Sequence, residues 1–565
     1  MAISRRQAAK LALAGPGLIA AGIARADWLS QSPKRVRLPL SEFVQDERLL
    51  NGLRRAIAAM KARKPSDPLS WFFQAAIHGV TDKMIAEAQA RDPAVASVDR
   101  AKYWNQCPHH GQNSANFLPW HRAYIHHLED ILRLHSGLDG FAIPYWDYSA
   151  PDNLDFPKDF GIQHLDGNFS NDDPTNINPL FHPMRDYFLC GYEHPHTDQL
   201  PLAQLSPRAV SAERALSDPH FFGEDEAKGL GGGVYDSDPG TRGLLEQSPH
   251  DQIHRVVGGD VVGTDDSGRQ IEINGAMGDP GTAAFDPIFP VHHANIDRLW
   301  AKWSCMPGKS WGALPDARWF REAPWFFFGT DGKEINRPRM DYFDHAALGV
   351  DFKDPQTHGP ALLLPDSLRS GTPLALAAMS GAMSMPAMPA PAAPAGRDMA
   401  GPVVASPDAV TQIGLTEKRS GAPFPAGNGE PSLSAAAPAA GAAPRAAAKT
   451  FITIHAIDLS GVHGSGFDIY LVRAGSDART LNPASPGYLG PVNLFVHGMG
   501  GRTTADQTFD ATGALHALAL ASLEGLQVAV VPYSLSTRPA AGRTRVKFLT
   551  GPLKASRISI SAVPA

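Results

Sequence analysis

The chain has 565 residues, of which 43% are hydrophobic and 19% are charged. This length predicts two or three domains, and the composition is typical of a globular protein with a large apolar core. The 51 basic and 57 acidic residues give a formal net charge of -6, which argues against a nucleic-acid-binding protein. Three cysteines cannot form a disulfide framework, whereas 22 histidines, the commonest neutral metal ligands, make a metal site the first hypothesis to examine.

The N-terminal segment, residues 1–26, has the features of a targeting sequence. Arg5 and Arg6 precede the apolar run Leu11–Ala24, and small residues follow at the spacing of a cleavage site. The run is too short and too rich in Gly and Pro to cross a bilayer stably. The segment resembles a twin-arginine export signal, which predicts a periplasmic or secreted protein. The alternative is a basic N-terminus followed by an Ala-rich helix.

The next segment, residues 27–370, is rich in Trp, Phe, His, Asp and Pro and has the composition of a folded domain. Amphipathic patterns predict helices through Trp120–Leu134 and Val291–Trp303, with long loops between elements. No other part of the chain qualifies as a membrane span.

Composition changes at residue 371 and again at residue 450. Residues 371–449 consist mainly of Ala, Pro, Gly, Ser and Met, which predicts a disordered linker. Its methionines carry soft thioether sulfurs that could deliver a metal, although drift in a low-complexity segment is the better explanation; they are Met379, Met383, Met385, Met388 and Met399. Residues 450–565 contain short alternating runs between Gly-rich turns, which predict a β-sandwich domain.

A first group of possible metal ligands lies in the N-terminal half of the large domain. An apolar helical stretch ends at His78, and a second predicted helix begins near His121. Between them lie Cys107, His109 and His110. From the residues alone, His78 is equally well explained as a ligand or as a residue that caps its helix.

A second group lies farther along the same domain. His250 and His254 are four residues apart, so on a helix both imidazoles face one side and can reach one ion. His293 and Asp297 show the same spacing, and the carboxylate could fix the helix or a neighbouring ligand. His292 is adjacent to His293, but we expect it to point elsewhere on the helix.

These two groups lie within motifs of a known family. The run Asp286–Phe289, followed by His293 and Asp297, resembles the second-copper signature of tyrosinases, catechol oxidases and haemocyanins. The run Phe117–Ile125, with Glu129 beyond it, resembles the first-copper signature of the same family. The resemblance is strong from about residue 33 to residue 365 and weak in the tail.

The resemblance implies a dinuclear type 3 centre in which two copper ions bind dioxygen as co-substrate. Imidazole suits both Cu(I) and Cu(II), and three ligands per metal leave each copper open toward the other. The implied fold is mainly α, with a four-helix-bundle dicopper core and long loops, followed by the linker and the C-terminal β-sandwich. The implied ligands are His78, His109 or His110, and His121 for the first copper, and His250, His254 and His293 for the second.

The middle ligand of the first copper departs from the family pattern. The family position, nine residues before the third ligand, is Gln112 in this chain. His109 forms a Cys-x-His unit with Cys107, which in fungal relatives becomes a covalent thioether, whereas His110 lies nearer the expected spacing. Both histidines remain candidates. Cys107 is either the thioether partner or a small buried apolar residue.

Three further residues have roles implied by the family. Glu246 matches a glutamate that holds a water near the coppers in plant relatives. Asp251 lies where many tyrosinases carry Asn, so it could accept the phenol proton, shift that water, or be a solvated surface residue. Pro280 lies thirteen residues before His293, where plant catechol oxidases place a bulky Phe, and a more open pocket would admit monophenols.

The C-terminal domain carries Phe467–Tyr470, which resembles a short motif in the β domain of plant polyphenol oxidases. In those relatives the domain covers the copper site and keeps the enzyme latent. The side chains that could fill the site here are Tyr488, Phe495 and His497. Alternatively, the domain serves oligomerisation or stability.

The resemblance predicts an exported tyrosinase that converts small phenols to o-diphenols and o-quinones and reduces dioxygen to water. A catechol or o-aminophenol oxidase without hydroxylase activity is one alternative. A haemocyanin-like oxygen carrier is another, although the export signal and the possible lid argue against it.

Overall fold

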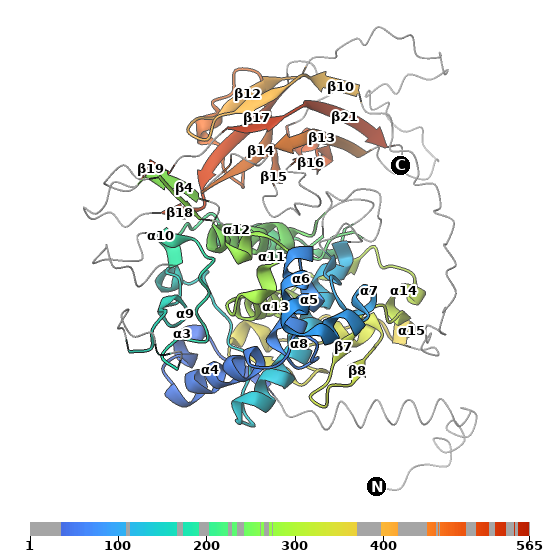
Figure 1. The fold of residues 1–565 in the computed structure, drawn as a ribbon. Helices are drawn as coiled ribbons and strands as arrows, with labels where there is room; N and C mark the ends of the chain where they lie inside the picture. The colour runs from blue at the N-terminus through green and yellow to red at the C-terminus, as the bar shows by residue number, and fades with distance from the viewer. Residues whose placement is uncertain are drawn as a thin grey trace, which may run out of the picture.

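A computed structural model describes two regions, which we call the helical region (residues 35–369) and the β region (residues 397–563). Figure 1 shows the β region stacked over one end of the helical region, next to α12. The described residues are 35–108, 114–166, 173, 175–190, 203–223, 229–233, 242–259, 261–264, 270–273, 275–369, 397–415, 449–458, 462, 464–492, 504–518, 526–537, 547–548 and 552–563. The predicted export segment, residues 1–26, lies outside them.

The helical region is built from helices of very different length joined by long loops. Within the described residues its helices are α3 (Leu40–Phe43), α4 (Glu47–Lys61), α5 (Trp71–His78), α6 (Asp82–Arg91), α7 (Arg100–Tyr103), α8 (Phe117–Ser136), α9 (Lys158–Gly161), α10 (Tyr187–Cys190), α11 (Glu213–Ser217), α12 (Asp251–Gly258), α13 (Phe289–Cys305), α14 (Ala317–Arg321) and α15 (Asp366–Arg369). Its short strands are β1 (Arg35–Arg37), β2 (Gln204–Leu205), β3 (His220–Phe222), β4 (Val261–Thr264), β5 (Gln270–Ile273), β6 (Ser310–Gly312), β7 (Phe327–Phe328), β8 (Glu334–Ile335) and β9 (Val350–Phe352).

Local sequence explains where the long helices begin and end. The Ser70 hydroxyl accepts a hydrogen bond from the Phe73 backbone N–H and caps α5, and the Asp46 carboxylate caps α4 in the same way. Gly137, with φ of 67°, ends α8 because a left-handed conformation there costs a glycine little. Helix α8 is buried along most of its length, and α4 and α13 both pack against it.

A buried charge network joins α8 to α13 and to β1. The Arg37 guanidinium donates to the Glu129 carboxylate at 2.9 Å and to Asp297 at 2.8 Å, and Arg122 donates to Asp297 at 2.5 Å. Burial raises the pKa of the Asp297 carboxyl, but the guanidinium groups of Arg122 and Arg37 outweigh burial and hold that pKa below its usual value. The network therefore fixes the two helices relative to each other.

Strand β1 pairs in parallel with β9, so the two ends of the helical region meet. Arg35 and Arg37, at the ends of this strand, are both buried. Among the described residues, no helix is long and apolar enough to cross a bilayer.

The β region consists of two antiparallel sheets, and most of their buried apolar side chains lie in one core, while Tyr470, Val472 and Ala529 belong to a separate cluster. Strand order is β10-β21-β13-β20-β11 in the larger sheet, with β16 also paired to β13, and β12-β17-β14-β15 in the smaller one. The strands of the two sheets are β10 (Arg397–Ala400), β11 (Val403–Ala405), β12 (Thr411–Gly414), β13 (Lys449–Asp458), β14 (Ser465–Arg473), β15 (Tyr488–Pro491), β16 (Thr504–Asp510), β17 (Leu526–Ser534), β20 (Leu553–Ala555) and β21 (Arg557–Val563), and one short helix, α16 (Thr512–Ala517), accompanies them.

The expected linker, residues 371–449, needs a correction. Its strands β10, β11 and β12 pair with β21, β20 and β17, so residues 397–414 belong to the β region. Backbone pairing with long neighbouring strands stabilises these three- and four-residue strands in spite of their low-complexity surroundings. Residues 371–396 and 416–448, where most of the linker was expected, lie outside the described residues.

Backbone pairing also joins the two regions. Strand β18 (Ser536–Thr537) pairs with β2, and β19 (Lys547–Phe548) pairs with β4, both antiparallel. Each pair takes one strand from the helical region and one from the β region. The two regions are therefore held together by strand pairs as well as by side chains.

Candidate metal centre

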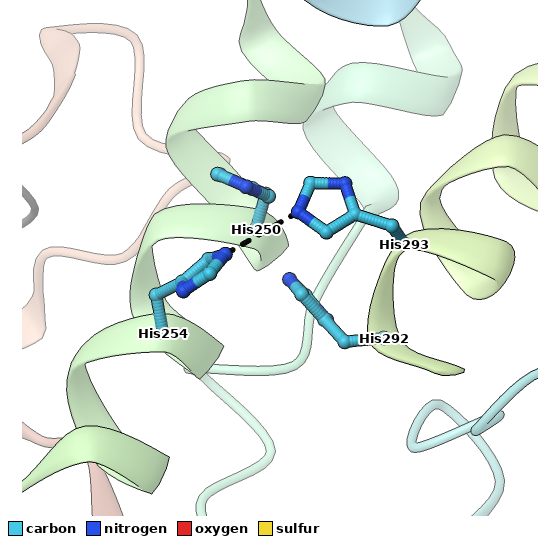
Figure 2. A group of neighbouring side chains, drawn as sticks. All are labelled: His250, His254, His292 and His293. Carbon is cyan, nitrogen blue, oxygen red and sulfur yellow. Dashed lines mark hydrogen bonds between the residues drawn. The ribbon is translucent and has the colours of Figure 1, made fainter. Parts of the chain in front are cut away.

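The second histidine group is formed by the adjacent helices α12 and α13. His250 immediately precedes α12, His254 lies one turn later, and His293 lies in the first turns of α13. All three side chains are buried. The Nε2 atoms of His254 and His293 are 3.4 Å apart, and Figure 2 shows the rings converging from both helices on one space. The helical spacing read from the sequence thus brings these imidazoles together.

Hydrogen bonds at the far ring nitrogens orient two of these imidazoles. The Nδ1 atom of His250 lies 2.9 Å from the Asp251 carboxylate, and the Nδ1 atom of His254 lies 2.9 Å from the backbone carbonyl oxygen of Met277. With Nδ1–H donating in each case, Nε2 carries the lone pair that a metal needs. Asp251 is fully buried, so it is not the solvated surface residue that the sequence left open.

His292, which we expected to point elsewhere, belongs to the same group. One potential ligand atom from each of His250, His254, His292 and His293 lies within 4.8 Å of the others. Adjacent helical positions differ by about 100° around the axis, and here the metal space lies between the two directions. A helical-wheel argument that assigns one face to the site therefore missed His292.

The first histidine group is formed by the end of α5 and the start of α8. His78, Cys107 and His121 are buried and offer potential ligand atoms within 4.8 Å of one another. The Nδ1 atom of His121 lies 2.8 Å from the Phe117 carbonyl oxygen, so Nε2 can carry the lone pair. The Cys107 sulfur lies 3.6 Å from that Nε2. His109 and His110 lie outside the described residues, so the middle ligand and the thioether stay predictions.

The two groups are adjacent. The imidazole rings of His121 and His293 stack with centroids 4.2 Å apart and planes within 8°. Phe117 and Phe289 pack edge-on or tilted against rings of both groups, at centroid distances of 4.5 Å from His121 and 4.2 Å from His293. Buried aromatic rings therefore separate the histidines from water.

Burial also keeps these histidines neutral. It lowers the pKa of His121 and of His254 to about 3, and it lowers that of His293 well below the usual value. A neutral imidazole can coordinate a metal, whereas a protonated one cannot. Buried, oriented and neutral imidazoles are suitable ligands for copper, because imidazole binds both Cu(I) and Cu(II).

Glu246 and Asp251 form a buried acidic pair beside His250. The Arg242 guanidinium lies 3.1 Å from the Asp251 carboxylate and 3.7 Å from that of Glu246. Burial raises the pKa of both carboxyls, against the opposing charge of Arg242. These two acids can therefore hold or exchange a proton near the histidines.

Pro280 lies beside the end of α5, near the first histidine group. It is buried, and a Cβ atom added at Gly79 would lie 2.4 Å from the Pro280 carbonyl oxygen. The Pro280 backbone thus packs closely beside the end of α5, next to His78, and Gly79 is required for this approach.

A third group that could suggest a metal lies on α8, at His126, His127 and Asp130. The Arg35 guanidinium lies 2.8 Å from His126 Nδ1 and 2.5 Å from the Asp130 carboxylate. A fixed cation there opposes a second cation, so this cluster is explained by its hydrogen bonds.

Comparison with known proteins gives one family. Residues 68–306 match the model of the common central domain of tyrosinase. The tyrosinase HcTyr1 of Hahella sp. (strain CCB-MM4) is 32% identical over 278 residues, which cover 45% of this chain and 51% of that protein. The chloroplastic polyphenol oxidase of Spinacia oleracea is 28% identical over 330 residues, which cover 57% of this chain and 47% of that protein. The chain spans about half the length of the curated relatives it matches.

Two solved structures share the fold. A recombinant latent aurone synthase (polyphenol oxidase) aligns with a TM-score of 0.52 and 20% identity, over 94% of this chain and 90% of the other. Latent apple tyrosinase aligns with a TM-score of 0.50 and 18% identity, over 94% of this chain and 98% of the other. These likenesses show the fold, and the matched model identifies residues 68–306 as the common central domain of tyrosinase, a family with a dinuclear copper centre that the buried histidine groups here are suited to hold.

Proposed function

We propose that this protein is a copper-dependent phenol oxidase that hydroxylates monophenols and oxidises o-diphenols to o-quinones with dioxygen. The observation that carries this proposal is the contact between the two histidine groups, through the stacked rings of His121 and His293. Two metals held by these groups would be neighbours with space between them. The copper pair, when bound, would supply electron transfer with dioxygen.

The chain's own residues would hold the metals, exclude water and move a proton. The second copper would be held by His250, His254 and His293, and the first by His78, His121 and either His109 or His110. Asp251 would orient His250 through its Nδ1 atom. Phe117 and Phe289 would exclude water from the rings.

Glu246 is the candidate acceptor for the proton of the incoming phenol. Its carboxyl is buried beside Arg242, and its pKa is raised toward the range in which an acid–base catalyst works best. Monophenol hydroxylation is further supported by Pro280, a smaller residue than the Phe that plant catechol oxidases carry there.

The β region is the candidate for a cover that keeps the enzyme latent. The Tyr533 hydroxyl, on β17, donates to the Gln252 side chain at 3.0 Å, and Gln252 lies between His250 and His254. The Arg208 guanidinium donates to the Asp468 carboxylate at 2.5 and 3.0 Å and to the Tyr488 hydroxyl at 2.7 Å. These contacts would hold the β region beside the second copper.

Of the three candidates for a side chain in the substrate's place, only Tyr488 is described. Its hydroxyl accepts a hydrogen bond from Arg208 and donates one to Asp468, at the boundary of the two regions. That position favours a role in docking over a role in the metal pocket. Phe495 and His497 lie outside the described residues and stay candidates, as does oligomerisation through the β region.

Residues 1–26 support export by the twin-arginine route, which carries folded proteins and would allow copper to be acquired first. An export assay with Arg5 and Arg6 both replaced by Lys would test this. Retention of the full chain inside the cell is the expected result, and unchanged export would argue against the route.

The proposed activity is tested by copper analysis and by oxygen uptake with tyramine and with catechol. We expect two coppers per chain and uptake with both substrates. Uptake with catechol alone would indicate a catechol oxidase, and reversible oxygen binding without turnover would indicate a carrier. Copper content well below two per chain would contradict the proposal.

Latency is tested in the full chain with Arg208→Ala, which removes the contacts to Asp468 and Tyr488. The variant should show a higher initial rate with catechol than the parent protein. Arg318→Ala is the matched control, because that side chain is 75% exposed on α14. Equal rates in all three proteins would argue against a cover.

A further inference from the structure

Four imidazoles, and not three, surround the second metal site. His292 is fully buried, and Figure 2 shows one of its ring nitrogens directed toward the space bounded by His250, His254 and His293. Its ring lies 4.9 Å from that of His254 and 5.3 Å from that of His250, centroid to centroid. A metal within reach of the other three is therefore within reach of His292.

The Nδ1 atom of His292 has a polar neighbour, as the Nδ1 atoms of His250 and His254 do. Its Nδ1 atom lies 3.3 Å from the hydroxyl oxygen of Tyr148, which is itself fully buried. With Nδ1–H donating to that oxygen, Nε2 carries the lone pair. The buried Nε2 atom has no hydrogen-bond partner among the described residues. A buried nitrogen of this kind is costly unless something binds it.

We propose that His292 is a fourth, exchangeable ligand of the second copper, which coordinates this ion while the first site is empty. The identity of the metal rests on the proposed function. Four imidazole nitrogens suit Cu(II). Binding of the first copper would release His292 and leave His250, His254 and His293 to hold the second.

This arrangement gives the two sites an order of filling. The second site, with four imidazoles on two helices, binds copper more tightly than the first and fills first. Tyr148 acts as a positioning residue, because it fixes the direction of the His292 lone pair without contacting the metal.

The test uses the full chain with His78→Ala, which disables the first site, loaded with one equivalent of Cu(II). Electron paramagnetic resonance should show nitrogen superhyperfine coupling from four imidazoles. Adding His292→Phe should reduce the count to three and weaken Cu(II) binding, in competition with a chelator, by about tenfold to a hundredfold. Adding Tyr148→Phe should keep four nitrogens with a smaller loss of affinity.

His358→Phe is the matched control, since its side chain is 52% exposed and distant in sequence from both groups. It should change neither the nitrogen count nor the affinity. If His292→Phe fails to fold, judged by its thermal unfolding without copper, His292→Asn replaces it. Three nitrogens before and after the substitution, or an unchanged affinity, would overturn the proposal.

Failure here is distinguishable from failure of the proposed function. Oxygen uptake with tyramine and catechol is measured on the unaltered protein and does not depend on the nitrogen count. A protein that oxidises phenols but shows three nitrogens would keep its function and lose only the role of His292.

Discussion

The two histidine groups differ in how the chain builds them. The second takes all of its histidines from α12 and α13 and the residues next to them, where helical spacing alone brings side chains together. The first combines the end of α5 and the start of α8 with the loop around Cys107. A ligand pair four residues apart on a helix is fixed by backbone hydrogen bonds, whereas a ligand on a loop depends on everything that packs against the loop.

The comparison indicates that the second group is the more preorganised of the two. Asp251 and the Met277 carbonyl orient its imidazoles. The second group in turn helps to position the first, because His293 stacks on His121 and because Asp297 forms an ion pair with Arg122. Substitutions in the two groups should therefore have unequal effects.

The largest effect is expected from His254→Ala. Loss of this ligand should lower oxygen uptake to that of copper-free protein, because only His250 and His293 would remain at the second site once the first copper had displaced His292. Copper per chain should fall to one or fewer, measured by elemental analysis. His358→Ala, at an exposed position, should retain both coppers. Two coppers in His254→Ala would remove this histidine from the ligand set.

The next largest effect should follow from breaking the ion pair between the two groups. Arg122→Ala leaves the buried Asp297 short of a cation, which should lower the free energy of unfolding by about 3–5 kcal/mol. Chemical denaturation of the copper-free protein measures this loss. The exposed Arg318→Ala should stay within about 0.5 kcal/mol of the parent.

The same ion pair should couple the two sites. Because Arg122 follows His121 and Asp297 lies one turn after His293, Arg122→Ala should weaken copper binding at both sites. Weakening at the first site alone would show that the groups are organised independently.

A smaller effect is expected on the pH dependence of stability, to which the buried acids beside the second group should contribute. Burial raises the pKa of Glu246 and Asp251 in the folded protein, so the folded state binds more protons than the unfolded state. The stability that their protonated forms contribute is fully present below the ordinary carboxyl pKa. It is lost progressively as the pH rises from there through the raised pKa values of the folded protein.

From about pH 7 to about pH 9, above the ordinary histidine pKa, the copper-free protein should therefore lose stability from these acids. Glu246→Gln should lose about 1 kcal/mol less than the parent over this range, measured by urea denaturation at each pH. Subtracting the parent's stability profile from that of the variant cancels the contributions of other groups that titrate in this range. Lys61 is one of them, because burial lowers its pKa to about 8. Parallel profiles would show that Glu246 does not titrate there.

The smallest effect is expected from Cys107→Ala in the first group. If Cys107 is only a small buried residue, the substitution should lower the free energy of unfolding by about 1 kcal/mol or less. The intact mass of the parent should then equal the mass calculated from its sequence. A thioether to His109 would instead appear as the loss of two hydrogens in the intact mass of the copper-loaded parent. Such a thioether would hold one imidazole of the first group rigidly, so the two groups would differ less in preorganisation.

The sequence predicted most of the second group and part of the first. Spacing on helices was enough for His250, His254 and the pair His293 and Asp297, because helical periodicity is a local property. His292 was missed since its direction depends on how α12 lies against α13, which is a tertiary fact. The choice between His109 and His110 depends on a loop and is still open.

Elsewhere, the sequence predicted a helical region followed by a β region, but it assigned residues 397–414, which form strands of the β region, to the linker. Val403 and Ile413 lie in strands too short to show an alternating pattern within an Ala- and Pro-rich segment. Their partners, in β20 and β17, lie more than a hundred residues away, and only such long-range pairing makes them strands. Likewise, no sequence pattern foretold that Tyr533 contacts Gln252.

The parallel pairing of β1 with β9 has a practical consequence for engineering. Since residues 35–37 and 350–352 run side by side, a short peptide could connect the two ends and new termini could be opened in an exposed loop. Such a circular permutant would keep α5, α8, α12 and α13 in one continuous polypeptide, while the β region could be supplied as a separate chain.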